Sequence, residues 1–296
     1  MDRAVELPRV SVVVPARDAA ATLPALLESM PALDYPRDRF EVLVVDNAST
    51  DRTAELARRF PVRLLRERSV ISSYAARNAG IRASTGEWIA FTDADCVVDR
   101  GWLRALAREA APPVGLVAGA IRSLPGGTTA QRFAAWIGAL DQSRTLAHPY
   151  LPYAQTANLA CAAAVFRAVG LFRPDLESGG DADLCWRVQR ETGFRFVAAP
   201  EAVVFHLHRS TVRGLLAQWR RYGRGAAQLE RLHRLDDRPA ASAGRRAVAR
   251  LGHLLAARPR PPLSAPLYLA LTRAAWAVGF RQGRRIRPDS AAPPRA

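Results

Sequence analysis

Residues 77–98 read Arg-Asn-Ala-Gly-Ile-Arg-Ala-Ser-Thr-Gly-Glu-Trp-Ile-Ala-Phe-Thr-Asp-Ala-Asp-Cys-Val-Val. The apolar run at 88–91 stops just before two carboxylates, Asp93 and Asp95, which are separated by one residue. Carboxylates at this spacing on a tight turn can both reach one hard cation or a cation-bound phosphate. The same pattern also occurs as a solvated acidic turn, so the meaning of this stretch depends on what surrounds it.

The segments around this stretch predict a parallel α/β sheet. Short apolar runs at 10–14, 41–45, 62–65 and 88–91 alternate with helical spacing at 20–30, 50–60 and 71–83. This alternation is typical of βαβ units, whose ligands bind beyond the carboxyl ends of the strands. Polar clusters follow three of the runs, at 16–18, 46–49 and 93–95, so we expect them to converge on one crevice. Ser49 or Thr50 is placed to cap the helix that follows.

The second half continues with helices and strands but carries different polar features. Helical patterns occupy 101–110, 129–147, 184–192 and the residues from 211, and strand patterns occupy 114–120, 158–163, 194–197 and 202–205. Asp181 follows two glycines at a helix start, where it is either a cap or a carboxylate that faces a crevice. His206 and His208 at a strand end are metal-capable, although such pairs are more commonly surface or hydrogen-bonded residues. Asp183 and Arg187 are spaced to pair on the helix.

Charge, cysteine content and missing motifs limit the possible partners, compartment and enzyme class of this protein. The net charge of +16 arises from 43 arginines and no lysine, and residues 209–296 hold 19 of these arginines against four acidic residues. A basic C-terminal region of this kind suggests an anionic partner such as a lipid surface or a nucleic acid. Three scattered cysteines favour a reducing compartment, and the charged N-terminus has no apolar signal core. No Gly-x-Gly-x-x-Gly or Walker loop is present, which counts against a dinucleotide dehydrogenase or a P-loop enzyme.

The C-terminal region divides into two parts. Residues 236–262 are rich in Arg, Ala and Pro, whereas 263–280 are apolar apart from Thr272 and Arg273. Eighteen residues are at the short limit for a membrane span, and a central arginine opposes spanning. An interfacial helix and a helix packed on protein remain the two interpretations. We therefore expect a domain at 1–235 and an Arg-rich extension at 236–296 that contains the apolar helix.

Five segments, in order, resemble the signatures of the family 2 glycosyltransferases, which have the GT-A nucleotide-sugar-binding fold. They are residues 10–18, 44–51, 76–95, 157–172 and 179–187. The resemblance implies an α/β fold with a mixed, mostly parallel central sheet flanked by helices, followed by a basic helical C-terminal extension. It also implies an enzyme that takes a sugar from a nucleotide donor.

The resemblance implies roles for individual residues. Donor-nucleotide contacts fall on Pro15, Ala16, Arg17, Asp18, Asp46, Asn47, Ser49, Arg77 and Asp93. Asp93, Asp95 and His206 are the implied ligands of a divalent cation, Mg²⁺ or Mn²⁺, and His208 competes with His206. Asp181 is the implied general base. The acceptor side is implied at Asn158, Asp183 and Trp186.

These roles describe an inverting, non-processive transfer from a nucleotide-diphosphate sugar, with a UDP-sugar expected, to a hydroxyl of a glycan, lipid or small molecule. A cation stabilises the leaving diphosphate, and a separate carboxylate takes the proton of the attacking hydroxyl. The alternatives are a sugar-phosphate nucleotidyltransferase and a non-catalytic protein that binds membranes or anions. We expect a cytoplasmic enzyme of cell-envelope glycan synthesis, peripheral on the inner membrane face through residues 209–296, with no nucleic-acid partner.

Two features depart from the family pattern. Many members have Glu-Asp at the base motif, and here Gly180 replaces the glutamate. The segment Gln218-Trp219-Arg220-Arg221-Tyr222 weakly resembles the Gln-x-x-Arg-Trp of processive synthases, with tyrosine in place of tryptophan. The first departure puts any acceptor-positioning role of that glutamate in doubt, and the second favours a non-processive enzyme.

Overall fold

The computed structural model describes residues 7–235, 262–286 and 293–295. Its centre is one eight-stranded sheet in the order β3-β2-β1-β4-β7-β6-β8-β5. The strands are β1 (Val10–Ala16), β2 (Phe40–Asp46), β3 (Arg63–Arg66), β4 (Trp88–Phe91), β5 (Cys96–Val98), β6 (Val114–Ser123), β7 (Leu159–Ala162) and β8 (Arg195–His206). Strands β1 to β4 are parallel, as are β6 and β8, whereas β7 and β5 run antiparallel to their neighbours. The expected mixed, mostly parallel sheet is confirmed.

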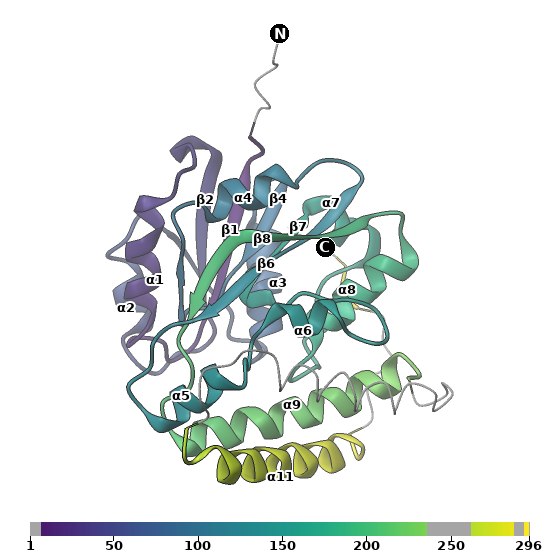
Figure 1. Ribbon diagram of the computed structural model, residues 1–296. Coiled ribbons are helices and arrows are strands. Elements are labelled where there is room, and N and C mark those ends of the chain that lie inside the picture. The colour runs from purple at the N-terminus through teal and green to yellow at the C-terminus, as the bar shows by residue number, and fades with distance from the viewer. Residues whose placement is uncertain (1–6, 236–261, 287–292, 296) are drawn as a thin grey trace.

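Helices cover both faces of this sheet (Figure 1). They are α1 (Leu23–Ser29), α2 (Thr53–Ala57), α3 (Ser73–Ala83), α4 (Trp102–Arg108), α5 (Thr129–Trp136), α6 (Gln142–Leu146), α7 (Ala163–Val169), α8 (Gly180–Glu191), α9 (Val212–Leu232) and α11 (Ala265–Gly283). Along β1, Val12 and Val14 pack into the core shared with α1, α2 and α4, while Val13 packs into the core shared with α3, α7 and α8. Successive side chains thus enter opposite cores, which explains the continuous apolar runs of the central strands.

The expected long helix at 129–147 is two shorter helices, α5 and α6. Gly138 lies between them with a φ of 61°, a left-handed conformation that interrupts the helix. The Asp141 carboxylate then accepts a hydrogen bond from the Ser143 amide and caps α6. The apolar spacing predicted the helical segments correctly but not the break between them.

Strand β8 unites the two short strands that the sequence predicts at 194–197 and 202–205. It pairs with β6 along its length, with two register irregularities, and the one after Gly119 spans Pro200. Proline has no N–H to donate to a neighbouring strand, so in a sequence it suggests that a strand ends. Here the strand bulges at Pro200 and continues. The three-residue β5 was not predicted. It pairs with the end of β8 so that Cys96 lies opposite His206, which brings this histidine beside Asp95.

The basic helices α9 and α11 lie side by side below the carboxyl ends of the central strands (Figure 1). The Thr211 hydroxyl accepts a hydrogen bond from the Gly214 amide and caps α9. Gly279 of α11 allows close approach, because a Cβ there would collide with the carbonyl group of Arg220 on α9. The expected apolar helix at 263–280 is therefore α11, packed on α9. Within the described ranges, no helix is long and apolar enough to cross a membrane.

Candidate active site

The loops that follow β1 and β2 are joined by hydrogen bonds. One carboxylate oxygen of Asp18 accepts hydrogen bonds from the Thr50 amide at 2.8 Å and its hydroxyl at 3.1 Å. The Ser49 hydroxyl in turn accepts the Asp18 amide at 3.1 Å. Asp18 and Ala48 both have positive φ, a strained backbone conformation that concentrates at binding sites. Ser49 and Thr50 therefore do not cap α2, as the sequence suggested, but stabilise the loop between 17 and 20.

The remaining donor-side residues lie at the ends of the same two strands. Asp46 is buried at the end of β2 and accepts the Ser49 amide at 3.2 Å. The Asn47 side chain donates to the carbonyl oxygens of Glu67 and Val70 and so holds the segment after β3. Pro15 and Ala16 end β1, and Arg17 is exposed beside them. The structure thus brings the predicted donor residues of the first two strands to one edge of the sheet.

The Asp-Ala-Asp turn lies at the same edge, and its two carboxylates have different partners. Arg77 on α3 is buried and forms an ion pair with Asp93. Asp95 Oδ1 lies 3.3 Å from His206 Nε2, and Asp95 Oδ2 lies 3.9 Å from Arg209 Nη2. Burial by itself would raise the pKa of Asp95, but the charges of His206 and Arg209 outweigh it and lower the pKa overall.

The two candidate metal histidines are distinguished by their environments. His206 faces Asp95, and its buried Nδ1 has no hydrogen-bond partner among the described residues. Burial would lower the pKa of His206, but the Asp95 carboxylate raises it overall. His208 instead lies with Nε2 2.7 Å from the Ser123 hydroxyl, and burial lowers its pKa to about 4. Of these two histidines, only His206 is placed to bind a metal ion together with Asp95.

Asp95 and His206 are the pair that fits a divalent cation. Their facing oxygen and nitrogen are 3.3 Å apart, close to the ~3 Å between neighbouring ligands that each bind an octahedral Mg²⁺ at ~2.1 Å. Asp93 is engaged by Arg77, and no group of three or more His, Cys, Asp or Glu side chains in the described ranges is arranged to hold a metal. The pair fits a cation that takes its other ligands from a bound diphosphate and from water, as Mg²⁺ commonly does.

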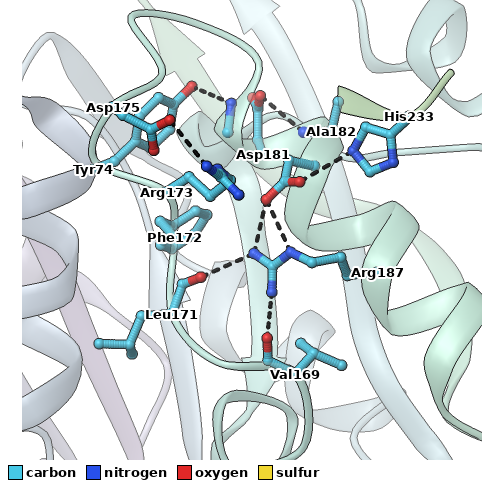
Figure 2. A network of polar contacts seen from close by, with 12 residues as sticks. Tyr74, Val169, Leu171, Phe172, Arg173, Asp175, Asp181, Ala182, Arg187 and His233 are labelled. Atoms are coloured by element: carbon cyan, nitrogen blue, oxygen red, sulfur yellow. Dashed lines mark hydrogen bonds and ion pairs between the residues drawn. The ribbon is translucent and has the colours of Figure 1, made fainter. Parts of the chain in front are cut away.

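Asp181 forms a second acidic site at the start of α8. The helix follows Gly179, whose φ of 86° gives the left-handed turn into its first residue. One Asp181 oxygen accepts the Ala182 amide at 3.0 Å (Figure 2). Burial raises the pKa of Asp181, and the positive charge of Arg77 opposes part of that rise. Arg77 therefore acts on both acidic sites, through an ion pair with Asp93 and through its field at Asp181.

Gly180 is a steric requirement of this helix start. A Cβ at this position would lie 2.8–2.9 Å from carbon atoms of the Tyr74 ring. The Gly180 amide donates to the Tyr74 hydroxyl at 2.8 Å, and the ring stacks on Phe172 with centroids 5.7 Å apart (Figure 2). The Arg77 guanidinium lies 5.6 Å from the centre of the same ring. Tyr74 thus occupies the space that a larger residue at 180 would need.

This arrangement can be compared with known proteins. The family model described as glycosyl transferase family 2 matches residues 11–170, more than half of the chain. The chain belongs to this family. The glycosyltransferase AglE of Haloferax volcanii is 34% identical over 238 residues, which cover 78% of this chain and 77% of AglE. The pre-mycofactocin glycosyltransferase of Mycobacterium tuberculosis is 34% identical over 233 residues, and the match spans about half of that longer protein, 48%.

Solved structures agree with this assignment. A mannosyltransferase of Pyrobaculum calidifontis, PcManGT, solved with GDP-Man and Mn²⁺, has a TM-score of 0.61 and 25% identity, covering 92% of this chain and 74% of its own. TarS of S. aureus (1–349) with UDP-GlcNAc has a TM-score of 0.53 at 15% identity, covering 94% of this chain and 90% of its own, which supports the fold alone. The protein is a family 2 glycosyltransferase with a GT-A fold.

The three residues expected on the acceptor side of this glycosyltransferase lie in its core. Asn158 donates to the carbonyl oxygens of Ala120 and Ala202 and accepts the Trp102 indole N–H at 2.8 Å. The indole N–H of Trp186 donates to the Leu151 carbonyl. The polar atoms of these side chains bond to other protein groups, and their direct contact with an acceptor stays a prediction. Their packing holds the strand ends and loops around the site.

Asp183 is the third of these buried residues. It accepts two hydrogen bonds from Arg187 at 2.8 and 2.9 Å and lies 3.0 Å from His233, beyond the end of α9 (Figure 2). Arg187 also donates to the carbonyl oxygens of Val169 and Leu171. Burial would raise the pKa of Asp183, but these partners lower it overall. The expected pair with Arg187 is confirmed, and the network ties α8 to α9.

Two tyrosines near the acidic sites were not predicted as site residues of the glycosyltransferase. Burial raises the pKa of Tyr222 on α9, and the charges of Asp181 and Asp93 add to this rise. Its hydroxyl accepts the Gln218 amide at 3.0 Å. The Gln-x-x-Arg-Tyr pattern on α9 was the available signal for Tyr222. Tyr74 had no comparable signal, because its contact with Gly180 joins residues more than a hundred positions apart.

Proposed function

We propose that this glycosyltransferase moves a sugar from a nucleotide-diphosphate donor to an acceptor hydroxyl in one inverting, non-processive step. The donor nucleotide contacts the edge formed by Asp18, Asp46 and the Asp-Ala-Asp turn. Asp181 serves as the general base for the acceptor. The observation that carries this proposal is the presence of two separate acidic sites, one at the Asp-Ala-Asp turn beside His206 and Arg77 and one at Asp181 in the first turn of α8. In agreement with these roles, the pKa of Asp95 is lowered and that of Asp181 is raised.

The reaction requires two separate acidic sites. The acceptor oxygen attacks the anomeric carbon, the bond from that carbon to the β-phosphate oxygen breaks, and the hydroxyl proton passes to the Asp181 carboxylate. A single displacement of this kind inverts the anomeric configuration. A carboxylate with a raised pKa is a stronger base and is better matched to a hydroxyl proton. Arg77 and Arg209 supply fixed positive charge on the side of the leaving diphosphate.

A divalent cation fits the leaving-group side of this site. Asp95 and His206 are the residues that we propose to hold Mg²⁺ or Mn²⁺, with Asp93 close by at the same turn. When bound, the cation neutralises charge that develops on the diphosphate. The relation to PcManGT, solved with Mn²⁺, supports a divalent cation of this kind.

For the donor we propose a UDP-sugar, and GDP-sugars are the competing class because PcManGT was solved with GDP-Man. The test is nucleotide release from a panel of UDP- and GDP-sugars, measured with Mn²⁺ and with a chelator. We expect turnover that requires the cation, and NMR of the product should show an anomeric configuration opposite to that of the donor. Retention of configuration, or full turnover in the chelator, would overturn the mechanism while leaving the family assignment intact.

A further inference from the structure

Helix α11 presents an apolar stripe to solvent. Leu267, Leu271 and Val278 are 60%, 37% and 45% exposed, and Leu263 just before the helix is fully exposed. Spacings of four and seven residues place Leu267, Leu271 and Val278 on one face of α11, and Leu263 precedes this face. Isolated exposed leucines are normal on protein surfaces, but an aligned set marks an interaction site.

The described segment that carries this stripe contains arginines and no acidic residue. Arg273, Arg281, Arg284 and Arg285 are all exposed on α11 or directly after it. Residues 262–286 contain four arginines and no Asp or Glu, and residues 209–235 contain seven arginines and one Glu. An apolar stripe that ends in a cluster of cations is the composition of a helix that lies at the surface of an anionic bilayer.

We propose that the exposed face of α11, defined by Leu263, Leu267, Leu271 and Val278, docks the enzyme on an anionic lipid surface. The helix would lie in the plane of the interface, with its leucines among the acyl chains and its arginines at the headgroups. A second copy of this chain is a poorer occupant, because it would bring the same excess of positive charge to the contact. This inference goes beyond the proposed function and does not depend on it.

The position of α11 gives such docking a consequence for the site. Arg231 of α9 donates to carbonyl oxygens at the end of α11, and Gly279 packs against the α9 backbone, so the two helices are fixed to each other. α9 in turn is tied to α8, the helix that carries Asp181, through the contact of His233 with Asp183. Docking by α11 therefore holds the site in one orientation to the lipid surface.

The test is co-sedimentation of the full chain with vesicles of phosphatidylcholine containing phosphatidylglycerol, and with pure phosphatidylcholine vesicles. We expect binding to the anionic vesicles that weakens at high salt. The variant L267E/L271E should lose binding, because it puts charge in the stripe without touching the α9 contact. The variant R281Q/R284Q/R285Q should bind on the order of 100-fold more weakly, at about fivefold for each arginine.

A matched control tests whether vesicle binding depends on this surface or only on the net charge of the protein. The variant R58Q/R82Q/R190Q removes three exposed arginines far from α11 and should bind almost as the natural protein does. Thermal unfolding of every variant confirms folding, and light scattering measures oligomeric state. Anionic-vesicle binding that survives L267E/L271E, or a dimer that this variant disrupts in a protein that ignores vesicles, would overturn the proposal. Because no donor is present, neither result bears on the proposed catalysis.

Discussion

The two acidic sites differ in the direction in which their surroundings shift the pKa of the carboxyl group. Asp95 lies at a strand end beside His206 and Arg209, and these cations lower the pKa of its carboxyl in spite of burial. Asp181 lies at a helix start where burial raises the pKa by more than Arg77 and nearby backbone amides lower it. One carboxylate is thus kept ionised and the other is prepared to take up a proton. A reaction that separates leaving-group stabilisation from proton removal needs both conditions at once.

The contrast has a structural origin in the groups that surround each carboxylate. The short strand β5 and the end of β8 place His206 opposite the residue that follows Asp95. At the other site, Arg77 and backbone amides lower the pKa of Asp181, but its burial outweighs them. Arg77 acts on both sides, through its ion pair with Asp93 and its charge near Asp181, so it couples the two.

The largest expected effect is that of Asp181→Asn. Loss of the general base should reduce turnover by about 10²- to 10⁴-fold. The folded-state pKa of Asp181 is raised, so its ionisation costs stability as the pH rises from the unfolded pKa through the folded one. The neutral amide removes this cost, and thermal unfolding at pH 7 should therefore show a more stable, inactive enzyme. Nucleotide release and a melting curve on one sample test both parts, and full activity would contradict the assignment.

Asp95→Asn should have a smaller effect on turnover and the opposite effect on stability. We expect nucleotide release to fall by about 10²-fold, since charge stabilisation of the leaving group typically contributes 10²- to 10³-fold. The pKa of Asp95 is lowered by folding, so its carboxylate stabilises the protein above the unfolded pKa, and this contribution is lost as the pH falls through the folded pKa. The amide should therefore lower the melting temperature at pH 7.

A surface control isolates this effect. Asp38→Asn removes the same charge from an exposed position and should leave both the melting temperature and the activity unchanged. If Asp95→Asn instead stabilised the protein as Asp181→Asn does, the two sites would not differ in the way that the structure indicates.

Arg77→Gln should shift a pH profile more than it reduces the maximal rate. The charge of Arg77 lowers the pKa of Asp181, so its removal should move the acidic limb of kcat to higher pH at saturating donor. Arg77→Lys keeps the charge and should leave the limb closer to that of the natural enzyme. An acidic limb that stays in place in Arg77→Gln would show that another group controls it.

The sequence predicted the parts of the molecule that depend on local pattern. The parallel strands, the Asp-Ala-Asp turn and the pair between Asp183 and Arg187 follow from spacing along one segment, and all are present. The sequence predicted that Ser49 caps a helix, but its hydroxyl accepts a hydrogen bond from the loop amide of Asp18. A hydroxyl before a helix can accept either from the helix or from a neighbouring loop. The local sequence does not distinguish these two partners, because Asp18 lies 31 residues before Ser49 in the chain.

The features that escaped prediction depend on long-range packing. The burial of Asn158, which is expected on the acceptor side, comes from Trp102 and two distant carbonyl groups. The choice of His206 over His208 as the partner of Asp95 depends on the register of β5 against β8. No local periodicity carries this register, because β5 is three residues long and was itself invisible in the pattern.

Gly180 offers the subtlest test of how the Asp181 site is built. Gly180→Ala places a methyl group 2.8–2.9 Å from carbon atoms of the Tyr74 ring, and overpacking of this kind typically costs about 1–3 kcal/mol of stability. Because Tyr74 also lies against Arg77, we expect a modest fall in kcat and a shifted acidic limb together with the lower melting temperature.

Tyr74→Phe is the matched variant, since it keeps the ring but removes the acceptor of the Gly180 amide, at a cost of about 1–3 kcal/mol for the unpaired group. If the ring positions Asp181, the pH profile should move in Gly180→Ala and stay nearly constant in Tyr74→Phe. A profile that moves only in Tyr74→Phe would assign the positioning to the hydrogen bond instead. In that case glycine at 180 would be needed for its small size but not for the basicity of Asp181.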